Sequence, residues 1–207
     1  MADKRVIAYV DGFNFYYGLK RAAWRKYYWL DLVSFLSKFL KDYQLLVEVH
    51  YFSAVPTDKE KQDRQDLFFS ANKLNPRFHL HLGKFLQKKI KCQSCQQSYI
   101  TYEEKESDVR LATAMISDVV KGKCDTSILV SADSDIIPAI DFIRSFKPEH
   151  KIYVYFPPHR VSFDLRQKAD RYILLERHPE KFEKSLLPDK IPLVPSGYIL
   201  QRPPQWR

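Results

Sequence analysis

The sequence has few of the residues that would place it in several large classes of protein. Only three cysteines occur in 207 residues, and this small odd number does not form a disulfide framework. Five glycines are too few for an all-β protein with many tight turns. No run approaches the 18 apolar residues of a membrane-spanning helix, and the first residues lack the apolar core of a secretory signal. We therefore expect a cytoplasmic protein without a membrane segment.

Several catalytic patterns are missing as well. The nucleotide-binding loops GxGxxG and GxxxxGK[ST] do not occur, and we find no Ser-His-Asp or Cys-His set. A phosphatase with an aspartyl nucleophile commonly carries a second acid two residues further on, and Phe13 holds that position after Asp11. Nucleotide-loop enzymes, triad hydrolases and phosphatases are therefore poor candidates.

The composition that is present supports a sizeable core and a polyanionic partner. Hydrophobic residues make up 45% of the chain and aromatic residues 14%, enough to bury a core. The net charge is +9, with 34 Lys and Arg against 25 Asp and Glu, which is typical of proteins that bind nucleic acid. The length suits one domain more readily than two.

One stretch near the middle of the chain combines a buried strand with a cluster of oxygen-bearing side chains. Ser127–Val130 is a short apolar run, and it is followed by Ser131, Asp133, Ser134 and Asp135 before a helical apolar pattern begins. Capping that helix needs one such residue, whereas four occur in five positions. A hard divalent cation prefers oxygen ligands of this kind. We interpret the stretch as a metal site, with helix capping as the alternative.

Two other segments supply acids in comparable positions. The apolar run Val6–Val10 ends in Asp11, and Asn14 is expected to cap the next helix, from Phe15 to about Lys26. Asp108 opens a further helix on its packed side, with Glu104 one turn earlier. The structural alternatives are a turn residue at Asp11 and, at Asp108, an acid that complements the helix dipole.

Strand and helix patterns alternate from Val6 to about Leu175, which predicts one α/β domain with a mainly parallel sheet. In such sheets ligands bind beyond the carboxyl ends of the strands, so the separate acids could converge at one edge. We assign residues 1–175 to this domain. Residues 176–207 are rich in proline and are expected to form an arm against the body or to be partly disordered.

Residues 84–104 are predicted to form a basic hairpin inserted in the domain. Its lysines are closely spaced, at Lys88, Lys89 and Lys91. Cys92 and Cys95 form a CxxC pair, a weak zinc signal because a structural site needs four ligands. The ligands that could complete it are Cys124, His79 or His81, although no spacing requires this.

A second basic segment, residues 20–29, interleaves cations with aromatic rings. The cations proposed to bind RNA are Lys20, Arg21 and Arg25, and Trp24 and Trp29 could stack on unpaired bases. The alternative is an ordinary helix whose tryptophans face the core.

Three motifs together resemble a known family. They are Tyr9-Val-Asp-Gly-Phe-Asn14, Glu104-Lys-Glu-Ser-Asp-Val109 and Leu129-Val-Ser-Ala-Asp-Ser-Asp135. Their order and spacing resemble NYN-domain proteins of the LabA-like group, within the PIN-like nuclease superfamily. The resemblance covers roughly residues 4–175. It implies a PIN-like three-layer α/β/α sandwich, an acidic pocket for Mg²⁺ or Mn²⁺, and a ribonuclease-type activity.

The resemblance assigns residues to that pocket by position. The catalytic and metal-binding acids would be Asp11, Asp108, Asp133 and Asp135, with polar support from Asn14, Ser131 and Ser134. The chain departs from many relatives at Ser107, Ala132 and Ile136, but none of these differences removes a carboxylate.

The leading hypothesis is therefore metal-dependent hydrolysis of RNA phosphodiester bonds, with the cation polarising the phosphate and activating water. The rival is an RNA-binding or adaptor module with a catalytically weak pocket, whose binding would persist without metal. The sequence leaves open a homodimer.

Replacing Lys88, Lys89 and Lys91 together with alanine should weaken RNA binding and flatten its dependence on salt, because fewer counterions are released. Affinity measured across a salt series tests this. Unchanged affinity would mean that these lysines are only a solvated face. The same measurement on Arg21→Ala and Arg25→Ala decides between the two basic surfaces.

Overall fold

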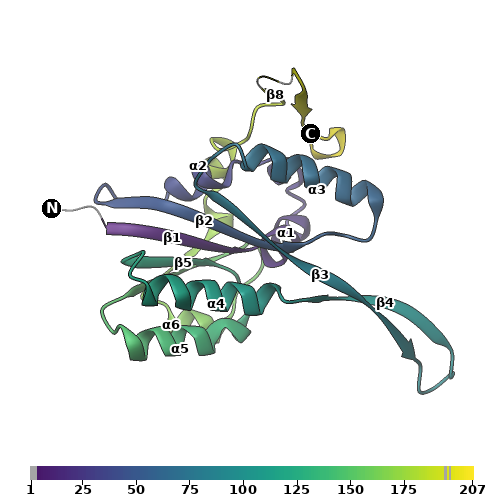
Figure 1. Ribbon diagram of the computed structural model, residues 1–207, viewed down its shortest axis with the longest axis horizontal. Helices are drawn as coiled ribbons and strands as arrows, with labels where there is room; N and C mark the ends of the chain where they lie inside the picture. Colours follow the sequence, from purple (N-terminus) through teal and green to yellow (C-terminus); the bar gives the residue numbers. More distant parts are fainter. Residues whose placement is uncertain (1–3, 194, 196) are drawn as a thin grey trace.

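The computed structural model describes residues 4–193, 195 and 197–207 (Figure 1). Residues 1–3 of the predicted domain, and 194 and 196 of the predicted arm, lie outside the described residues. A seven-stranded sheet has the order β4-β3-β2-β1-β5-β6-β7. In chain order its strands are β1 (Lys4–Asp11), β2 (Gln44–Ala54), β3 (Phe78–Lys91), β4 (Ser98–Lys105), β5 (Thr126–Val130), β6 (Lys151–Phe156) and β7 (Arg171–Leu174).

Helices cover both faces of this sheet (Figure 1). One face packs against α1 (Gly12–Arg21), α2 (Leu32–Ser37) and α3 (Lys59–Asn72), and the other against α4 (Ser107–Val120), α5 (Ile137–Phe146) and α6 (Phe163–Lys168). Short 3-10 helices lie at η1 (Arg25–Tyr28), η2 (Ser134–Ile136), η3 (Leu175–Arg177) and η4 (Pro204–Trp206). None of the helices in the described ranges is long and apolar enough to span a bilayer.

The alternation of side chains along β1 explains the two hydrophobic cores. Val6, Ala8 and Val10 point into the core beneath α1 to α3, whereas Ile7 and Tyr9 point into the core beneath α4 and α5. A strand buried on both faces reads as a continuous apolar run, as this one does. The predicted three-layer α/β/α fold with a mainly parallel sheet is therefore confirmed.

The centre of the sheet is the pair β1 and β5, which run parallel with Val10 opposite Val130. From β1 the chain builds β2 and β3 on one side, and then crosses to build β5, β6 and β7 on the other. The strand order therefore reverses between β1 and β5, and open α/β sheets bind their ligands beyond the carboxyl ends of the strands at such a point. Asp11 and Ser131 come from these two strand ends.

The predicted hairpin is continuous with the sheet. Residues 78–83 of β3 pair in parallel with β2, and residues 84–91 of the same strand pair antiparallel with β4. Gly83 lies where the pairing changes from parallel to antiparallel. A Cβ there would lie 2.5 Å from the carbonyl oxygen of Lys105, so this close approach needs glycine. Beyond this point the two strands leave the body and project into solvent (Figure 1).

Two local expectations are wrong. Asn14 does not cap α1, because the helix begins at Gly12 and its cap is Asp11, whose carboxylate accepts a hydrogen bond from the Asn14 amide. The helix also ends at Arg21 instead of continuing to about residue 26, and η1 follows. Trp29 is fully buried, and its indole Nε1 donates a 2.9 Å hydrogen bond to the Pro188 carbonyl, so it faces the core.

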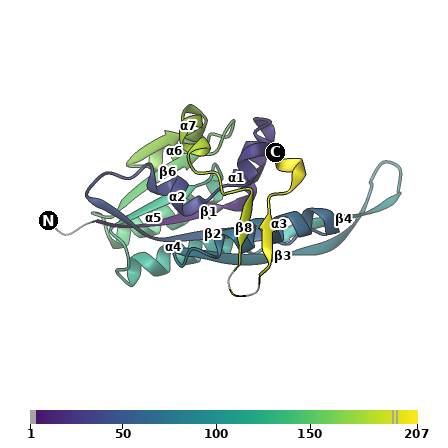
Figure 2. The ribbon, with the colours of Figure 1, turned by 90° about the horizontal axis from the view of Figure 1, so that it is seen from above.

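The described part of the C-terminal segment packs against the body beside α3 (Figure 2). It contains α7 (Pro179–Glu183) and a small sheet of β8 (Lys190–Pro192) and β9 (Ile199–Gln201). Phe182 of α7 is fully buried, and its ring lies 4.2 Å from that of Phe35 and 6.3 Å from that of Phe15, measured between centroids. The C-terminal segment therefore completes the hydrophobic core beneath α1 and α2.

Phe182→Ala should lower the free energy of unfolding by about 3 to 5 kcal/mol, because it removes a buried ring and leaves a cavity. Urea unfolding measures this, with Phe163→Ala as the control, since Phe163 is 67% exposed. The control should change stability by less than about 0.5 kcal/mol. Equal, small effects would show that the C-terminal segment contributes nothing to the core.

Candidate active site

Three aspartates from separate elements meet at the carboxyl edge of the sheet. Asp11 ends β1, Asp108 lies in the first turn of α4, and Asp133 caps η2 directly after β5. One carboxylate oxygen from each lies within 4.8 Å of the others. The parallel pairing of β1 with β5 supplies two of these positions, and α4, packed beneath the same strands, supplies the third.

Hydrogen bonds hold Asp11 in a fixed orientation. Its Oδ1 accepts from the backbone amide of Asn14 at 2.9 Å, and its Oδ2 accepts from the Asn14 side-chain amide and from the Ser131 hydroxyl, the latter at 2.8 Å. The Ser131 oxygen in turn accepts from the amide of Asp133 at 3.0 Å. Asn14 and Ser131 therefore lie where the polar support was predicted. The Asn14 Oδ1 is buried and, within the described residues, has no hydrogen-bond partner.

The other two predicted site residues lie at the rim. Asp135 and Ser134 are exposed in η2, and neither belongs to the group of three close carboxylates. The amide of Asp135 donates to Asp133 Oδ1 at 3.0 Å, which orients that carboxylate. The structure thus separates three clustered acids from a fourth that contributes charge at the edge of the cluster.

The carboxylates raise one another's affinity for protons. Burial raises the pKa of Asp11, against the opposing effect of its hydrogen bonds from Asn14 and Ser131. Burial and then the charges of Asp11 and Asp133 raise the pKa of Asp108 to about 6, with smaller contributions from Glu104 and Asp135. This repulsion would be relieved by a bound cation. An all-oxygen set of three carboxylates fits Mg²⁺ or Mn²⁺.

Helix α1 runs from this cluster along the same edge of the sheet. Gly18 lies so close to the residues after β6 that a Cβ would be 2.8 Å from Pro157, and the Arg21 guanidinium donates to the His159 carbonyl at 3.1 Å. The exposed Lys20 and Arg21 therefore lie on the edge that carries the aspartates. Arg25 is exposed in η1.

Two aromatic residues on α1 were missed by the sequence reasoning. Tyr16 and Tyr17 are 37% and 47% exposed, whereas Trp24 is partly buried and Trp29 fully buried. Lys20 lies over the Tyr17 ring, 5.7 Å from its centroid. The sequence could have indicated them, because Lys20 follows Tyr17 by three residues and Tyr16 by four, and residues at these spacings share a helix face.

The hairpin lysines differ in their surroundings. Lys88 forms a 3.4 Å ion pair with Glu103, whereas Lys89 and Lys91 are exposed and make no ion pair within the described residues. Cys92 and Cys95 sit in the hairpin turn, and the metal-ligand groups found among the described residues do not include them. The suggested additional ligands lie in the body, where Cys124 contacts Ser127 and His81 contacts His50.

Comparison with known proteins identifies the family. Residues 5–176 match the NYN domain. The chain therefore belongs to the NYN domain family. It is 29% identical to 6-hydroxy-3-succinoylpyridine 3-monooxygenase HspA of Pseudomonas putida, over 68% of this chain and 56% of that protein. It thus spans little more than half the length of that relative.

A solved structure shares the fold. A protein of unknown function from Vibrio parahaemolyticus superposes with a TM-score of 0.55 and 18% sequence identity, over 83% of this chain and 92% of that one. This likeness concerns the fold alone. The NYN assignment agrees with the resemblance carried by the three motifs, and the LabA-like subgroup stays a prediction.

Asp108→Asn should become progressively more stable than wild type as the pH rises from about 4 to about 6. Asp108 has a higher pKa in the folded state than in the unfolded state, so it loses its proton at a lower pH when the protein is unfolded. The free energy of unfolding of wild type therefore falls as the pH rises through this window. The asparagine variant lacks this effect. Melting temperatures measured against pH in EDTA test it, and a constant difference between the two proteins would contradict the electrostatic account.

Proposed function

We propose that this NYN domain is a metal-dependent ribonuclease that hydrolyses RNA phosphodiester bonds with Mg²⁺ or Mn²⁺. The observation that carries the proposal is the convergence of Asp11, Asp108 and Asp133, with one carboxylate oxygen of each within 4.8 Å of the others, at the carboxyl edge of the sheet where β1 and β5 end. The net charge of +9 and the family's nuclease-type fold support RNA as the partner. A cytoplasmic location and a homodimer remain predictions of the sequence.

A bound divalent cation would withdraw charge from the scissile phosphate and promote attack by water. The protein holds the carboxylate ligands in position before a cation binds. Asn14 and Ser131 fix the Asp11 carboxylate by three hydrogen bonds, so little reorganisation is needed when the cation arrives. Asp108 would supply a third carboxylate, and its raised pKa of about 6 means that protons would compete with the cation below that pH. Asp133 is fixed by the amide of Asp135.

The surface beside the acids suits a single-stranded polyanion. Lys20 and Arg21 are exposed and would contact phosphates, and the exposed rings of Tyr16 and Tyr17 would stack on bases. The acidic cluster itself repels phosphate until a cation binds, so the neighbouring cations are needed to hold the RNA. Lys89 and Lys91, exposed on the projecting hairpin, would form a second basic surface.

One observation favours the alternative of an RNA-binding module with a catalytically weak pocket. Asp135, the fourth acid of the motif, is exposed and lies outside the close group, which leaves three clustered carboxylates. Such a module would bind RNA equally well with metal or with EDTA and would not cleave it.

The Pseudomonas relative is named as a monooxygenase, and this chain covers only part of it. The cluster at the carboxyl edge consists of carboxylates, whereas oxygen-activating iron centres typically combine two histidines with one carboxylate. We therefore base the proposed function on phosphodiester chemistry.

Asp133→Asn should abolish cleavage of single-stranded RNA in Mg²⁺ or Mn²⁺, and metal should raise its melting temperature much less than that of wild type. Asparagine keeps the capping hydrogen bond but removes one charge. The matched control is Asp58→Asn, because Asp58 caps α3 through the Lys61 amide and does not belong to the aspartate cluster. This control should cleave and respond to metal like wild type.

Equal thermal stabilisation of wild type and Asp133→Asn by metal would show that Asp133 is only a cap. RNA binding without cleavage under every metal condition would favour the binding module. Cleavage that persists in EDTA would contradict the metal-dependent mechanism.

A further inference from the structure

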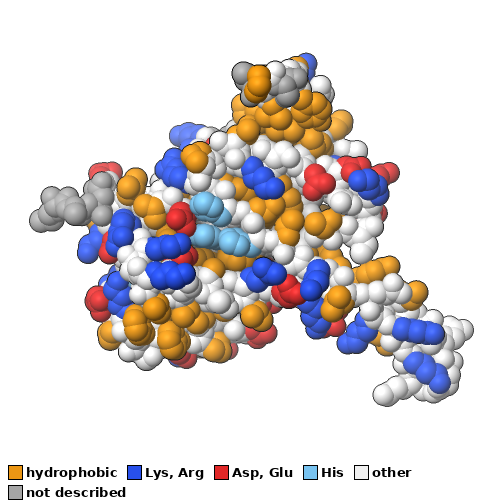
Figure 3. Space-filling model, in the orientation of Figure 1, with side chains coloured by type: hydrophobic (Ala, Val, Ile, Leu, Met, Phe, Trp, Pro, Cys, Tyr) orange, Lys and Arg blue, Asp and Glu red, His pale blue; other side chains and the backbone are white. Residues whose placement is uncertain are grey.

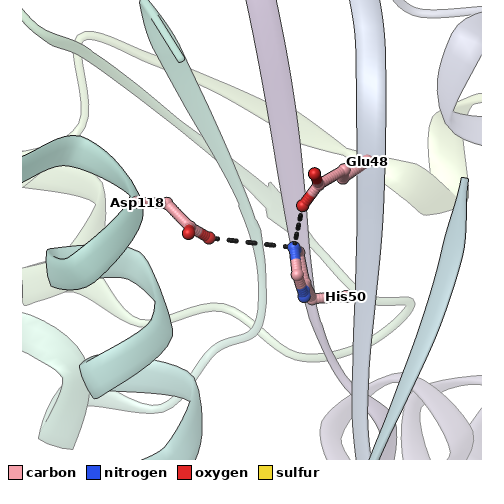
Figure 4. A group of neighbouring side chains, drawn as sticks. All are labelled: Glu48, His50 and Asp118. Carbon is pink, nitrogen blue, oxygen red and sulfur yellow. Dashed lines mark hydrogen bonds and ion pairs between the residues drawn. The ribbon is translucent and has the colours of Figure 1, made fainter. Parts of the chain in front are cut away.

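A second group of metal-ligand side chains lies away from the aspartate cluster. Glu48 and His50 come from β2 and Asp118 from near the end of α4, and one ligand atom of each lies within 4.8 Å of the others. Figure 4 shows the three side chains pointing toward one another between strand and helix. Asp118 follows Asp108 by ten residues on α4, about 15 Å along the helix axis. The two groups are therefore separate.

His50 is the centre of this group. Its Nε2 lies 2.7 Å from Glu48 Oε2 and 3.7 Å from Asp118 Oδ2, and its Nδ1 lies 2.8 Å from His81 Nε2. A neutral imidazole has one N–H, so one ring nitrogen presents a lone pair. If Nδ1 donates to His81, the Nε2 lone pair faces two carboxylates, and a cation bound between them would remove the repulsion. Metal-bound histidines commonly donate their other N–H in this way. In the other tautomer, the Nε2–H donates to Glu48 and the site holds no ion.

The charges around the group leave a surplus of negative charge. Asp118 Oδ1 pairs with Lys123 at 2.9 Å, and its Oδ2 accepts from the Tyr9 hydroxyl at 3.1 Å. Apart from the His50 ring itself, Lys123 is the one cation that pairs with the two carboxylates within the described residues. Buried carboxylates usually have partners that balance their charge, whereas here one lysine pairs with a group of two carboxylates.

An ion can reach this position from solvent. Glu48, His79 and His81 are partly exposed, and the histidines form a surface patch bordered by lysines and arginines (Figure 3). The His79 ring stacks beside that of His50 with 5.1 Å between centroids, and no hydrogen bond joins it to the group. It lies next to the site without being placed to bind the same ion.

We propose that Glu48, His50 and Asp118 form a second metal site, for a divalent transition-metal ion of the Zn²⁺ class. One imidazole and two carboxylates suit such an ion, whereas the all-carboxylate cluster suits Mg²⁺ or Mn²⁺. Three protein ligands leave a fourth position for water. His81 holds the His50 ring in the tautomer that the ion needs. The ion would tie α4 to β2, and α4 carries Asp108 at its other end.

The test uses the full chain with Cys92→Ser and Cys95→Ser, so that thiols cannot bind the ion, in excess Mg²⁺ to occupy the aspartate cluster. Calorimetric titration with Zn²⁺ should give one ion per chain, and Co²⁺ should produce the visible absorption of a bound ion. Zn²⁺ should also raise the melting temperature. His50→Gln and Asp118→Asn should lower the affinity at least tenfold, and His81→Phe by about 10- to 100-fold.

The matched control is His79→Gln, which should bind Zn²⁺ as tightly as its parent. Asp108→Asn in the same background should also retain the ion. Should His50→Gln or Asp118→Asn fail to fold, Glu48→Gln tests the site instead, because Glu48 is partly exposed. The proposal is overturned if the parent binds no Zn²⁺, if binding survives all the ligand substitutions, or if Asp108→Asn abolishes it. None of these readings depends on nuclease activity.

Discussion

The hydrogen bond from Ser131 to Asp11 joins the two strand ends on which the candidate active site depends. It can form because β1 and β5 are parallel neighbours that end at the same level, so a hydroxyl after one strand meets a carboxylate after the other. The same Ser131 oxygen accepts from the Asp133 amide and thereby sets the course of the next loop. The conformation of the loop after β5 and the orientation of the Asp11 carboxylate thus both depend on Ser131.

Much of this arrangement could be predicted from the sequence, because the information is local. Apolar runs ending in Asp11 and Ser131 mark buried strands with polar ends, and the alternation of patterns indicates a parallel sheet. Local patterns were less decisive about which residue caps a helix. Both Asp11 and Asn14 are good capping residues, and only the backbone shows that Asp11 caps α1 while also facing the other acids.

The features that were missed or left open depend on contacts between distant residues. Glu48 and His50 are two apart on a strand and so share a face, but Asp118 reaches them only because α4 packs beneath that part of the sheet. The burial of Trp29 likewise depends on the carbonyl of Pro188, far along the chain. The place of Asp135 at the rim follows from the 3-10 turn after Asp133, which a motif cannot specify.

The base of the β3–β4 hairpin is connected almost directly to the aspartate cluster. β4 ends at Lys105, Glu106 takes a left-handed conformation with φ of 81°, and Asp108 follows in the first turn of α4. Lys84 at the base of β3 also pairs with Glu106 at 2.8 Å. Only Glu106 and Ser107 separate the end of β4 from Asp108. The direction in which the hairpin leaves the body is therefore set by the same short connection that positions one carboxylate of the cluster.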